Sequence, residues 1–481
     1  MRIPGSRRPR SLLRASVLAA VLASASWLVW AAPAGAAVAN VYCPPYGGDN
    51  LQTAIFTAAS SGDTLYIHGT CTGQFTVAKN LTLQGVTAGA ALNGNAGGTT
   101  LTVSGGVSVT VASLTITNGK SLSGGGGIRM VGSGTSVSLT SSTVSGNAAN
   151  PLDFGGGVDM VDDSQSLTLT GSTVSSNTAR GGAGIGIEGD GSSVGLTTST
   201  LSGNNAASTQ GGGILAFGTG DVVTADGSAF TGNIAGGGGA IAMVYPGTIT
   251  LSSTTVSLNT ASGEGGGIET NSGSTVTLTN SVVSRNQQTG NSGFGGGGMF
   301  LSDGTATLTN TTVTRNTAVL NGGGIGLLGG NGASLALTGS TVSYNTTQRN
   351  GGGIATFGEA DATDVTLTSS LVNGNLARHG QGGGISTATF EGDVTVTLVG
   401  TRVGPAPGSL NGNQAELGGG ISNDAEYGSA TLNLTSRSFV VGNVATYAGG
   451  GVYNYGNPAP ATVNVVSSGI LLNHPDNCYG C

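Results

Sequence analysis

Small apolar and polar residues alternate along most of this chain, in short stretches that recur about every 30 residues. Residues 276–279 read Val-Thr-Leu-Thr, residues 282–283 are both Val, and residues 268–270 continue the alternation after a glycine run. An apolar residue at every second position is typical of a β-strand with one buried face. Each repeat is therefore predicted to hold three short strands separated by turns, and no helix.

Two short motifs mark every repeat. The first is Gly-Gly-Gly-Ile or a close variant, and its twelve copies lie 26 to 36 residues apart. The residues that close this glycine motif are Ile128, Val158, Ile185, Ile214, Ile241, Ile268, Met299, Ile325, Ile354, Ile385, Ile421 and Val452. The second motif is an apolar residue followed three positions later by asparagine. Its asparagines are Asn147, Asn177, Asn204, Asn233, Asn259, Asn286, Asn316, Asn345, Asn375, Asn413, Asn443 and Asn473.

Repeats of this length and pattern predict a parallel β-helix, in which each repeat forms one rung of a solenoid. Rungs stack at roughly 4.8 Å. No rung can bury its apolar side chains alone, but stacked neighbours can. One predicted inward column is Leu139, Leu169, Leu196, Leu251, Leu278, Leu308, Leu337 and Leu367. A second is Val144, Val174, Leu201, Phe230, Val256, Val283, Val313, Val342 and Val372.

Both motifs have structural explanations. Asparagine tolerates a left-handed backbone, and amides stacked at one corner can hydrogen-bond along the stack. We therefore predict that the asparagines form a turn ladder. Glycine runs permit positive φ angles and let neighbouring rungs approach closely.

The two motifs resemble the GGAI and FxxN repeats of chlamydial polymorphic outer-membrane proteins, over roughly residues 113–473. The segments 51–55 (LQTAI), 62–67 (GDTLYI) and 80–83 (NLTL) resemble the opening of pectate-lyase-like β-helix proteins, in which a short helix covers the first rung. These resemblances imply an all-β, single-stranded, right-handed parallel β-helix of about 12 to 15 rungs with a short N-terminal capping helix.

The residues themselves also favour a capping helix. Asp49 and Gln52 have the spacing of a capping box ahead of the apolar positions Leu51, Ile55 and Ala59. Such a helix would shield the open edge of the first rung.

The N-terminal segment has the order of a secretory signal peptide. Five arginines precede an uncharged run from Ala15 to Trp30, and small residues of the A-x-A type follow. We predict a signal peptide over residues 1–39, a cap with the first rungs over 40–118, the repetitive β-helix over 119–473 and a cysteine-containing tail over 474–481. The protein is therefore expected to be secreted and to have no membrane span.

Composition narrows the possible partners. Charged residues make up only 8% of the chain, against about 25% in an average protein. Without the predicted signal peptide, ten basic and 22 acidic residues remain, which gives a formal net charge of −12. Such a surface repels nucleic acid and anionic membrane, so neither is an expected partner.

Both ends of the predicted β-helix carry two cysteines. The four cysteines are Cys43, Cys71, Cys478 and Cys481. Three pairings are open. Disulfides are the default in an exported chain, and pairing within each end would fasten terminal rungs that have a neighbour on one side only.

The acidic residues follow the repeat. Of the 22, 15 fall within ten positions after the residue that closes the glycine motif. They are Asp159, Asp162, Asp163, Glu188, Asp190, Asp221, Glu269, Asp303, Glu359, Asp361, Asp364, Glu391, Asp393, Asp424 and Glu426. Several arginines lie near the asparagine turn instead, so an acidic edge and a basic edge are expected.

The strongest catalytic candidates on this edge are Asp162 and Asp163, with Glu188 and Asp190 on the next rung. Equal distances from the glycine motif put the Cα atoms of Asp163 and Asp190 about 5 Å apart. That separation suits a carboxylate pair or a shared calcium ion. No Lys or His accompanies these acids, whereas a polysaccharide lyase needs a basic proton acceptor. Enzyme activity is therefore left open but disfavoured, and no cofactor other than a possible calcium ion is expected.

We predict a secreted, non-catalytic and monomeric protein with a surface, adhesion or glycan-binding role, whose partner is an extracellular glycan or a cell-surface component. Exposed aromatics such as Phe300, Tyr453 and Tyr455 are candidate contacts, but stacking between neighbouring rungs is the favoured explanation for them. Residues 405–407 (Pro-Ala-Pro) are expected as part of a protruding loop.

Two alternatives belong to other classes. The first is an extracellular polysaccharide lyase or glycoside hydrolase. The second is an ice-binding protein, because Thr-x-Thr segments such as residues 168–170 would present threonines on one flat face. Gly195, Asp226 and Ala336 interrupt that array.

Overall fold

Residues 38–481, which the computed structural model describes, form a β-helix in which each turn of the chain contributes one rung. One rung runs through β30 (Ile268–Thr270), β31 (Thr275–Thr279), β32 (Val282–Ser284) and β33 (Gln287–Gln288). The three predicted strands are present, and the prediction missed the short fourth strand that follows the asparagine. The predicted signal peptide lies almost entirely outside the described residues.

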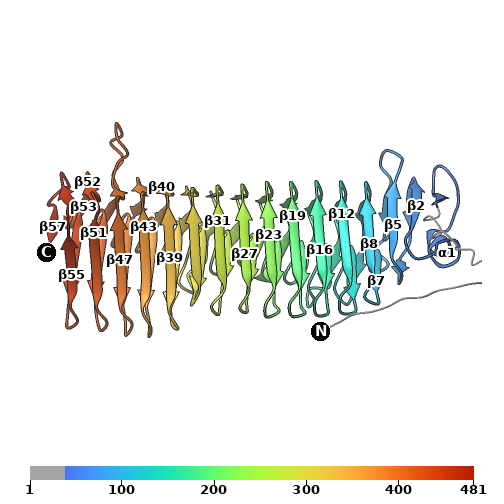
Figure 1. Cartoon of the computed structure of the whole chain (residues 1–481), viewed down its shortest axis with the longest axis horizontal. Helices are drawn as coiled ribbons and strands as arrows, with labels where there is room; N and C mark the ends of the chain where they lie inside the picture. Colours follow the sequence, from blue (N-terminus) through green and yellow to red (C-terminus); the bar gives the residue numbers. More distant parts are fainter. Residues whose placement is uncertain (1–37) are drawn as a thin grey trace, which may run out of the picture. The chain divides into compact units, whose positions relative to one another are not determined.

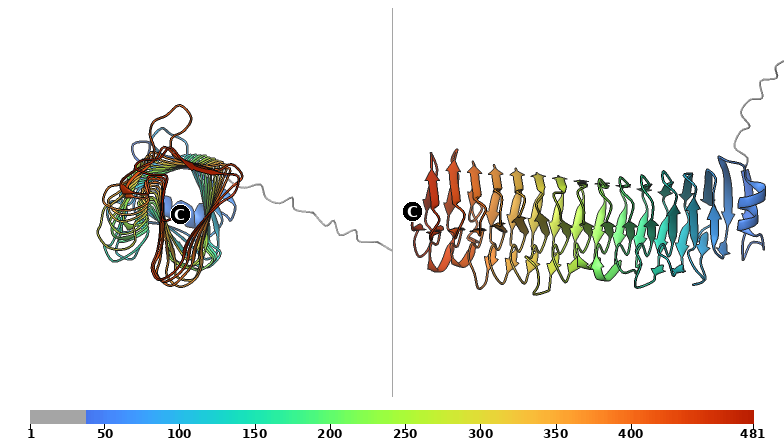
Figure 2. Two further views of the ribbon diagram at one scale, coloured as in Figure 1. Left: turned by 90° about the vertical axis from the view of Figure 1, so that its left-hand side faces the viewer. Right: turned by 90° about the horizontal axis from the view of Figure 1, so that it is seen from below.

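Equivalent strands of successive rungs pair in parallel and build long sheets along one axis (Figures 1 and 2). Sheet A has 16 strands, sheets B and C have 15 each, and sheet D has nine. Sheet A begins with β1 (Val38–Tyr42) and ends with β55 (Ala461–Val465), and sheet B begins with β3 (Thr70–Thr72) and ends with β56 (Gly469–Leu471). Sheet C begins with β4 (Phe75–Val77) and ends with β57 (Cys478–Tyr479). Sheet D begins with β21 (Asn205–Gln210) and ends with β53 (Val444–Ala448). The predicted fold class and number of rungs are confirmed.

Inward-facing side chains of sheets A, B and C fill the interior. In sheet A, Leu251 pairs with Leu278 of the next rung and Leu278 with Leu308, and all three side chains are fully buried. Val256 and Val283 are aligned in the same way in sheet B. Burying one such side chain contributes about 1.5–3 kcal/mol. The core shared between rungs is therefore the main source of stability.

The glycine motif is needed because neighbouring rungs approach closely. Gly296, its first residue in one rung, has a φ of 79°, which is unfavourable for other residues. A Cβ atom on Gly298, the third glycine, would lie 2.6 Å from the carbonyl oxygen of Gly324 and 3.0 Å from Cγ of Asn316. Gly298 and Asn316 belong to the same rung and touch each other, which explains why the two motifs recur together.

The asparagines form a buried ladder. Asn286 Nδ2 donates to Oδ1 of Asn316 at 3.0 Å and to the carbonyl of Val256 at 2.9 Å. Asn286 Oδ1 accepts from Nδ2 of Asn259 at 2.9 Å and from the backbone N–H of Asn259 at 3.1 Å. The same bond between amides continues without a break from Asn147 to Asn473.

The left-handed backbone expected at the asparagines lies one residue earlier. Leu258, Arg285, Arg315 and Tyr344, each directly before a ladder asparagine, have φ between 54° and 60°. In other rungs this position is a glycine, such as Gly146. The asparagine is therefore required for its amide and not for its backbone conformation.

A short helix covers the first rung, as predicted. Helix α1 (Leu51–Thr53) continues as a π-helical turn over Ala54–Ala58, and Leu51 and Ile55 are buried against the core. Gln52 fixes this helix to β4, because its amide exchanges two hydrogen bonds with the backbone of Thr76.

The expected capping box is wrong in detail. Asn50 is the N-cap, and its Oδ1 accepts from the backbone N–H of Thr53 at 3.0 Å. Asp49 instead accepts from the backbone N–H of Tyr42 at 2.8 Å. Asn50 lies one position closer to the helix than Asp49 and therefore makes the cap.

Both disulfides close within their own end of the rod. Cys43 pairs with Cys71, and Cys478 pairs with Cys481. The first bond joins the segment before α1 to β3, so it fastens the cap to the first rungs. Two disulfides are typical of a chain that resides outside the cytoplasm.

The loop between β48 (Arg402–Val403) and β49 (Gln414–Leu417) protrudes from one corner of the rod (Figures 1 and 2). Leu410 in this loop is 97% exposed. The loop leaves the regular rung because it is longer than the equivalent turns, which are only a few residues long.

Candidate functional site

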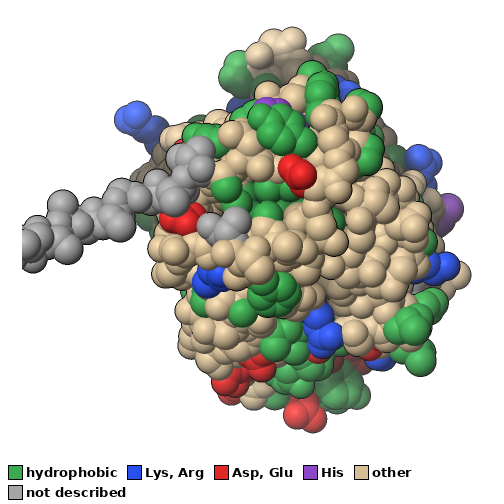
Figure 3. All heavy atoms as spheres, turned by 90° about the vertical axis from the view of Figure 1, so that its right-hand side faces the viewer, with side chains coloured by type: hydrophobic (Ala, Val, Ile, Leu, Met, Phe, Trp, Pro, Cys, Tyr) green, Lys and Arg blue, Asp and Glu red, His purple; other side chains and the backbone are tan. Residues whose placement is uncertain are grey.

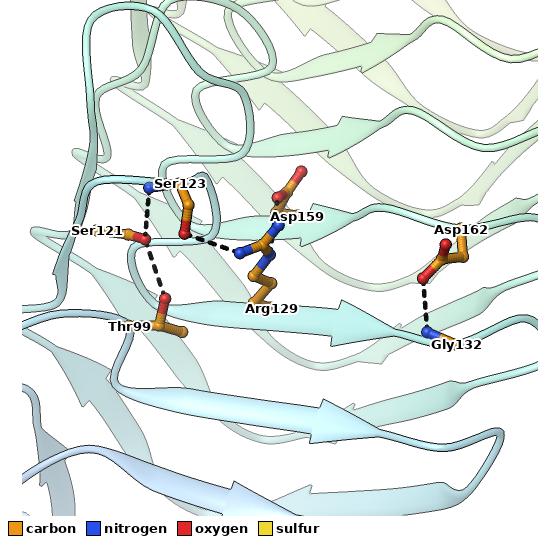
Figure 4. A network of polar contacts seen from close by, with 7 residues as sticks. All are labelled: Thr99, Ser121, Ser123, Arg129, Gly132, Asp159 and Asp162. Atoms are coloured by element: carbon orange, nitrogen blue, oxygen red, sulfur yellow. Dashed lines mark hydrogen bonds and ion pairs between the residues drawn. The ribbon is translucent and has the colours of Figure 1, made fainter.

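The predicted acidic site consists mainly of hydrogen-bond acceptors between rungs. Asp162 Oδ2 accepts from the backbone N–H of Gly132 at 2.6 Å (Figure 4), and Asp163 Oδ1 accepts from that of Asp190 at 2.9 Å. Asp190 Oδ1 accepts from the backbone N–H of Thr219 at 2.7 Å. Asp163 and Asp190 therefore lie on adjacent turns, with their carboxylates directed to backbone groups.

Glu188 acts on a different carboxyl group, that of Asp159 in β15 (Val158–Met160). Asp159 is fully buried, and burial together with Glu188 raises its pKa well above the usual value. Arg129 opposes this effect only in part, because its Nε lies 3.8 Å from Asp159 Oδ2 while Nη1 donates to Ser123 (Figure 4). Asp159 is closed off from any ligand in this arrangement.

Within residues 38–481, no three or more His, Cys, Asp or Glu side chains are placed to hold a metal ion together. The acidic turns therefore provide hydrogen bonds between rungs, and we assign them no calcium site.

A groove lies elsewhere, on the outer face of sheet C. The residue after the glycine motif points outward in every rung, and this outward column varies strongly in size. From rung to rung it reads Arg129, Asp159, Gly186, Leu215, Ala242, Glu269, Phe300, Gly326, Ala355, Ser386, Ser422, Tyr453 and Tyr479. Four small residues between Phe300 and Tyr453 leave space that bulkier side chains would fill.

Two adjoining hollows occupy this face, and together they are called the outer groove here. The larger, of about 420 Å³, is lined by Glu264, Gly293, Phe294, Asn321, Leu328, Arg349, Asn350, Ala355, Thr356, Phe357, Glu359, Ser386 and Ala388. The smaller is lined by Thr209, Gln210, Gly236, Gly237, Gly263, Glu264, Glu269, Ser292 and Gly293. Glu264 and Gly293 line both hollows, so the two hollows are direct neighbours.

Two phenylalanines define the apolar part of the outer groove. Phe294, in the loop before β34 (Met299–Ser302), packs above Gly326, where an added Cβ would lie 3.3 Å from its ring. Its ring centroid lies 5.9 Å from that of Phe357 and 6.0 Å from that of Phe300. Phe294 and Phe357 remain partly exposed. They present aromatic surface beside the small side chain of Ala355.

The prediction that Phe300 is exposed is wrong. Phe300 is only 1% exposed because the glycine-rich loop that carries Phe294 folds over it. Tyr455 is 43% exposed, and Tyr453 stacks between Tyr455 and Tyr479 with ring centroids 6.1 and 5.3 Å away.

Further aromatic side chains lie near acidic side chains along the side of the rod that carries sheet C. Phe217 is close to Phe154 and Tyr245, and Phe390 is close to Tyr427. Seen from the N-terminal end, acidic and hydrophobic side chains gather together at the lower edge (Figure 3). Phe217, Tyr245, Phe390 and Tyr427 all lie in turns that follow strands of sheet C.

The three carboxyl groups of the outer groove differ in burial: Glu269 is buried, Glu264 is partly buried and Glu359 is exposed. Glu269 is 3% exposed, and its Oε1 accepts from Nε2 of Gln210 at 2.7 Å and from Nδ2 of Asn271 at 3.1 Å. Its Oε2 has no hydrogen-bond partner. Burial raises the pKa of Glu269 to about 7 and also raises the pKa of Glu264, whose Oε1 accepts from the backbone N–H of Phe294.

Glu269 makes stability depend on pH. The pKa of Glu269 is about 7 in the folded state, and its ordinary value is 4.5. The free energy of unfolding therefore falls as pH rises from 4.5 to about 7. The loss is about 3 kcal/mol. We expect Glu269→Gln, measured by urea unfolding, to raise stability above that of the unmodified protein at about pH 8 and to change it little at about pH 4. Asp364→Asn, which alters an exposed acid of sheet A, serves as the control. A gain that is equal at both pH values would contradict this assignment.

The threonine face of sheet A is not a flat array. Thr168 and Thr170 of β16 (Ser166–Thr170) are exposed, but Thr168 pairs with Gly195 of the next rung, where a shallow hollow opens. Asp226 and Ala336 interrupt the face at other rungs.

The comparisons with known proteins agree with the fold. A model of the right-handed β-helix region matches residues 156–398, and the chain belongs to this family. No curated protein is similar enough to count as a relative of this chain. In the described part of the chain, no helix has the length and apolar character needed to cross a bilayer.

The acidic edge predicted from the sequence and the outer groove share few residues. Of the residues lining the outer groove, only Glu269 and Glu359 were among the acids assigned to the acidic edge. Glu264 and Phe294 lie in the turn before the glycine motif, where no repeat pattern distinguishes them. The size of the side chains in the outward column, which is large at Phe300 and small at Ala355, was the signal that could have located the groove.

Proposed function

We propose that this protein is a secreted rod that binds an extended glycan in the outer groove without cleaving it. The observation that carries the proposal is a pair of neighbouring hollows that span several rungs, with aromatic surface at Phe294 and Phe357 and carboxyl groups in their walls. Export is supported by the signal-peptide pattern of residues 1–39 and by the two disulfides.

The physical basis is the amphipathic character of sugars. The C–H face of a pyranose ring can pack on an aromatic ring and remove apolar surface from water, while its hydroxyl groups need polar partners at the edges. Phe357 offers such a surface, and Glu264, Asn350 and Arg349 lie around it. Rungs recur at about 4.8 Å, which is nearly the advance of one sugar ring.

Substitution of Phe357 tests this proposal. We expect Phe357→Ala to weaken binding of a matching oligosaccharide about tenfold, because the variant loses the apolar contact with one sugar ring. Isothermal titration calorimetry against neutral, amino and uronic oligosaccharides measures the affinity, and a reducing-end assay on the same mixtures detects cleavage.

Phe439→Ala is the matched control, because Phe439 lies in β52 (Phe439–Val441) of sheet B and is 37% exposed. This control should bind like the unmodified protein. Equal affinities for all three proteins would remove the outer groove from the function, and release of reducing ends would show an enzyme instead of a binding protein.

A further inference from the structure

We propose that the ligand of the outer groove is a glycan with free amino groups, held by the carboxyl groups of Glu264 and Glu269. This inference rests on the proposed glycan-binding function and specifies its ligand class.

The first support is an unsatisfied acceptor. Glu269 is almost completely buried and lines the smaller hollow, yet its Oε2 has no hydrogen-bond partner. That oxygen lies against Gly237 in the wall of the same hollow, at a position where an added Cβ would clash with it. A buried carboxylate oxygen without a donor is costly. An ammonium group in the smaller hollow would lie beside this carboxyl group and favour its ionised form.

The second support is Glu264, which lies where the two hollows join. Its Oε1 is occupied by the backbone N–H of Phe294, and no donor in the described chain reaches its other oxygen. Glu264 is only half-buried, so that oxygen can be reached from the groove. An ammonium group donates to carboxylates in short, charge-assisted hydrogen bonds.

The net charge of the groove favours a ligand of the opposite charge. The ionisable side chains that line the two hollows are Glu264, Glu269, Glu359 and Arg349. Three carboxyl groups against one guanidinium disfavour a uronic acid polymer and favour a cationic ligand.

The shape of the groove favours an amino sugar over a basic peptide. Phe294 and Phe357 present aromatic faces that suit the flat C–H side of a sugar ring. The groove follows rungs spaced at about 4.8 Å, whereas an extended peptide advances about 3.3 Å per residue. A peptide could not place successive side chains in register with successive rungs.

Two ligands of equal length test the inference: a glucosamine hexasaccharide and an N-acetylglucosamine hexasaccharide. They are titrated calorimetrically at about pH 7, where Glu269 is partly ionised and the amines are partly protonated. The glucosamine oligomer is expected to bind about tenfold more tightly. The double variant Glu264→Gln and Glu269→Gln should lose that preference, whereas Asp364→Asn should keep it. Because Glu269→Gln is expected to stabilise the fold at neutral pH, urea unfolding of the same samples separates a loss of recognition from a loss of structure.

The outcomes distinguish this inference from the proposed function. Equal affinity for the two hexasaccharides, with both weakened by Phe357→Ala, would overturn the amino-sugar inference and leave glycan binding intact. Tighter binding of a uronic oligosaccharide or of a lysine-rich peptide would also overturn it. Binding of no oligosaccharide at all would overturn both.

Discussion

Replacing Asn286 by alanine is expected to lower the free energy of unfolding by about 4 kcal/mol. The side chain is 1% exposed and bridges three rungs through Asn259, Asn316 and Val256. Alanine would leave the backbone N–H and one amide hydrogen of Asn259 without their acceptor, and would remove the amide donor from the carbonyl of Val256. Asn316 Oδ1 would keep only the backbone N–H of residue 286 as a donor. Each buried group left unsatisfied costs about 1–3 kcal/mol.

Equilibrium unfolding in urea, compared at constant m-value, measures this change. Asn464→Ala is the control, because Asn464 also bonds to an asparagine of the preceding rung, Asn433, but on the exposed face of sheet A. The control is expected to change stability by less than about 0.5 kcal/mol. If Asn286→Ala were as mild as this control, the ladder would not be a major source of stability.

Gly298→Ala is expected to have the second largest effect, a loss of about 3 kcal/mol. The added methyl group would lie 2.6 Å from the carbonyl oxygen of Gly324 and 3.0 Å from Cγ of Asn316. Both atoms are held by neighbouring rungs, so neither can move without disturbing the ladder. Urea unfolding measures the loss, and amide exchange of Asn316 should rise in the same variant.

Gly195→Ala is the matched substitution at a glycine with free space. A Cβ there would lie 3.5 Å from Oγ1 of Thr224 and 3.9 Å from Cγ2 of Thr168, which are ordinary contacts. We expect a stabilisation of about 0.5 kcal/mol from the reduced freedom of the unfolded chain. Similar effects of the two substitutions would mean that close approach does not explain the glycine motif.

The fold could be predicted from the sequence because the same local pattern recurs in every rung. Alignment of residues such as Leu278 and Leu308 follows directly from their spacing to the asparagine motif, because each lies eight residues before the ladder asparagine of its rung. The fourth strand, represented by β33, was missed because two residues are too few to show an alternating pattern. The left-handed residue was misplaced because Arg285 occupies a position that local preference would give to glycine or asparagine.

The candidate site was predicted less well, because spacing along the chain does not show what a carboxylate contacts. Asp163 and Asp190 do lie on adjacent turns, but their oxygens accept from backbone N–H groups. Glu264 and Phe294, which shape the outer groove, belong to turns whose length varies from rung to rung. Their position depends on how a loop folds back over sheet C, and this is a tertiary property.

Mapping where a bound oligosaccharide slows backbone amide exchange tests the glycan-binding groove most directly. Amides of the loops at residues 289–296 and 347–352, which border the outer groove, should exchange more slowly when the ligand is bound, and those of the threonine face of sheet A should not change. Protection confined to sheet A or to the loop around Leu410, with no change at the groove, would contradict the proposed function.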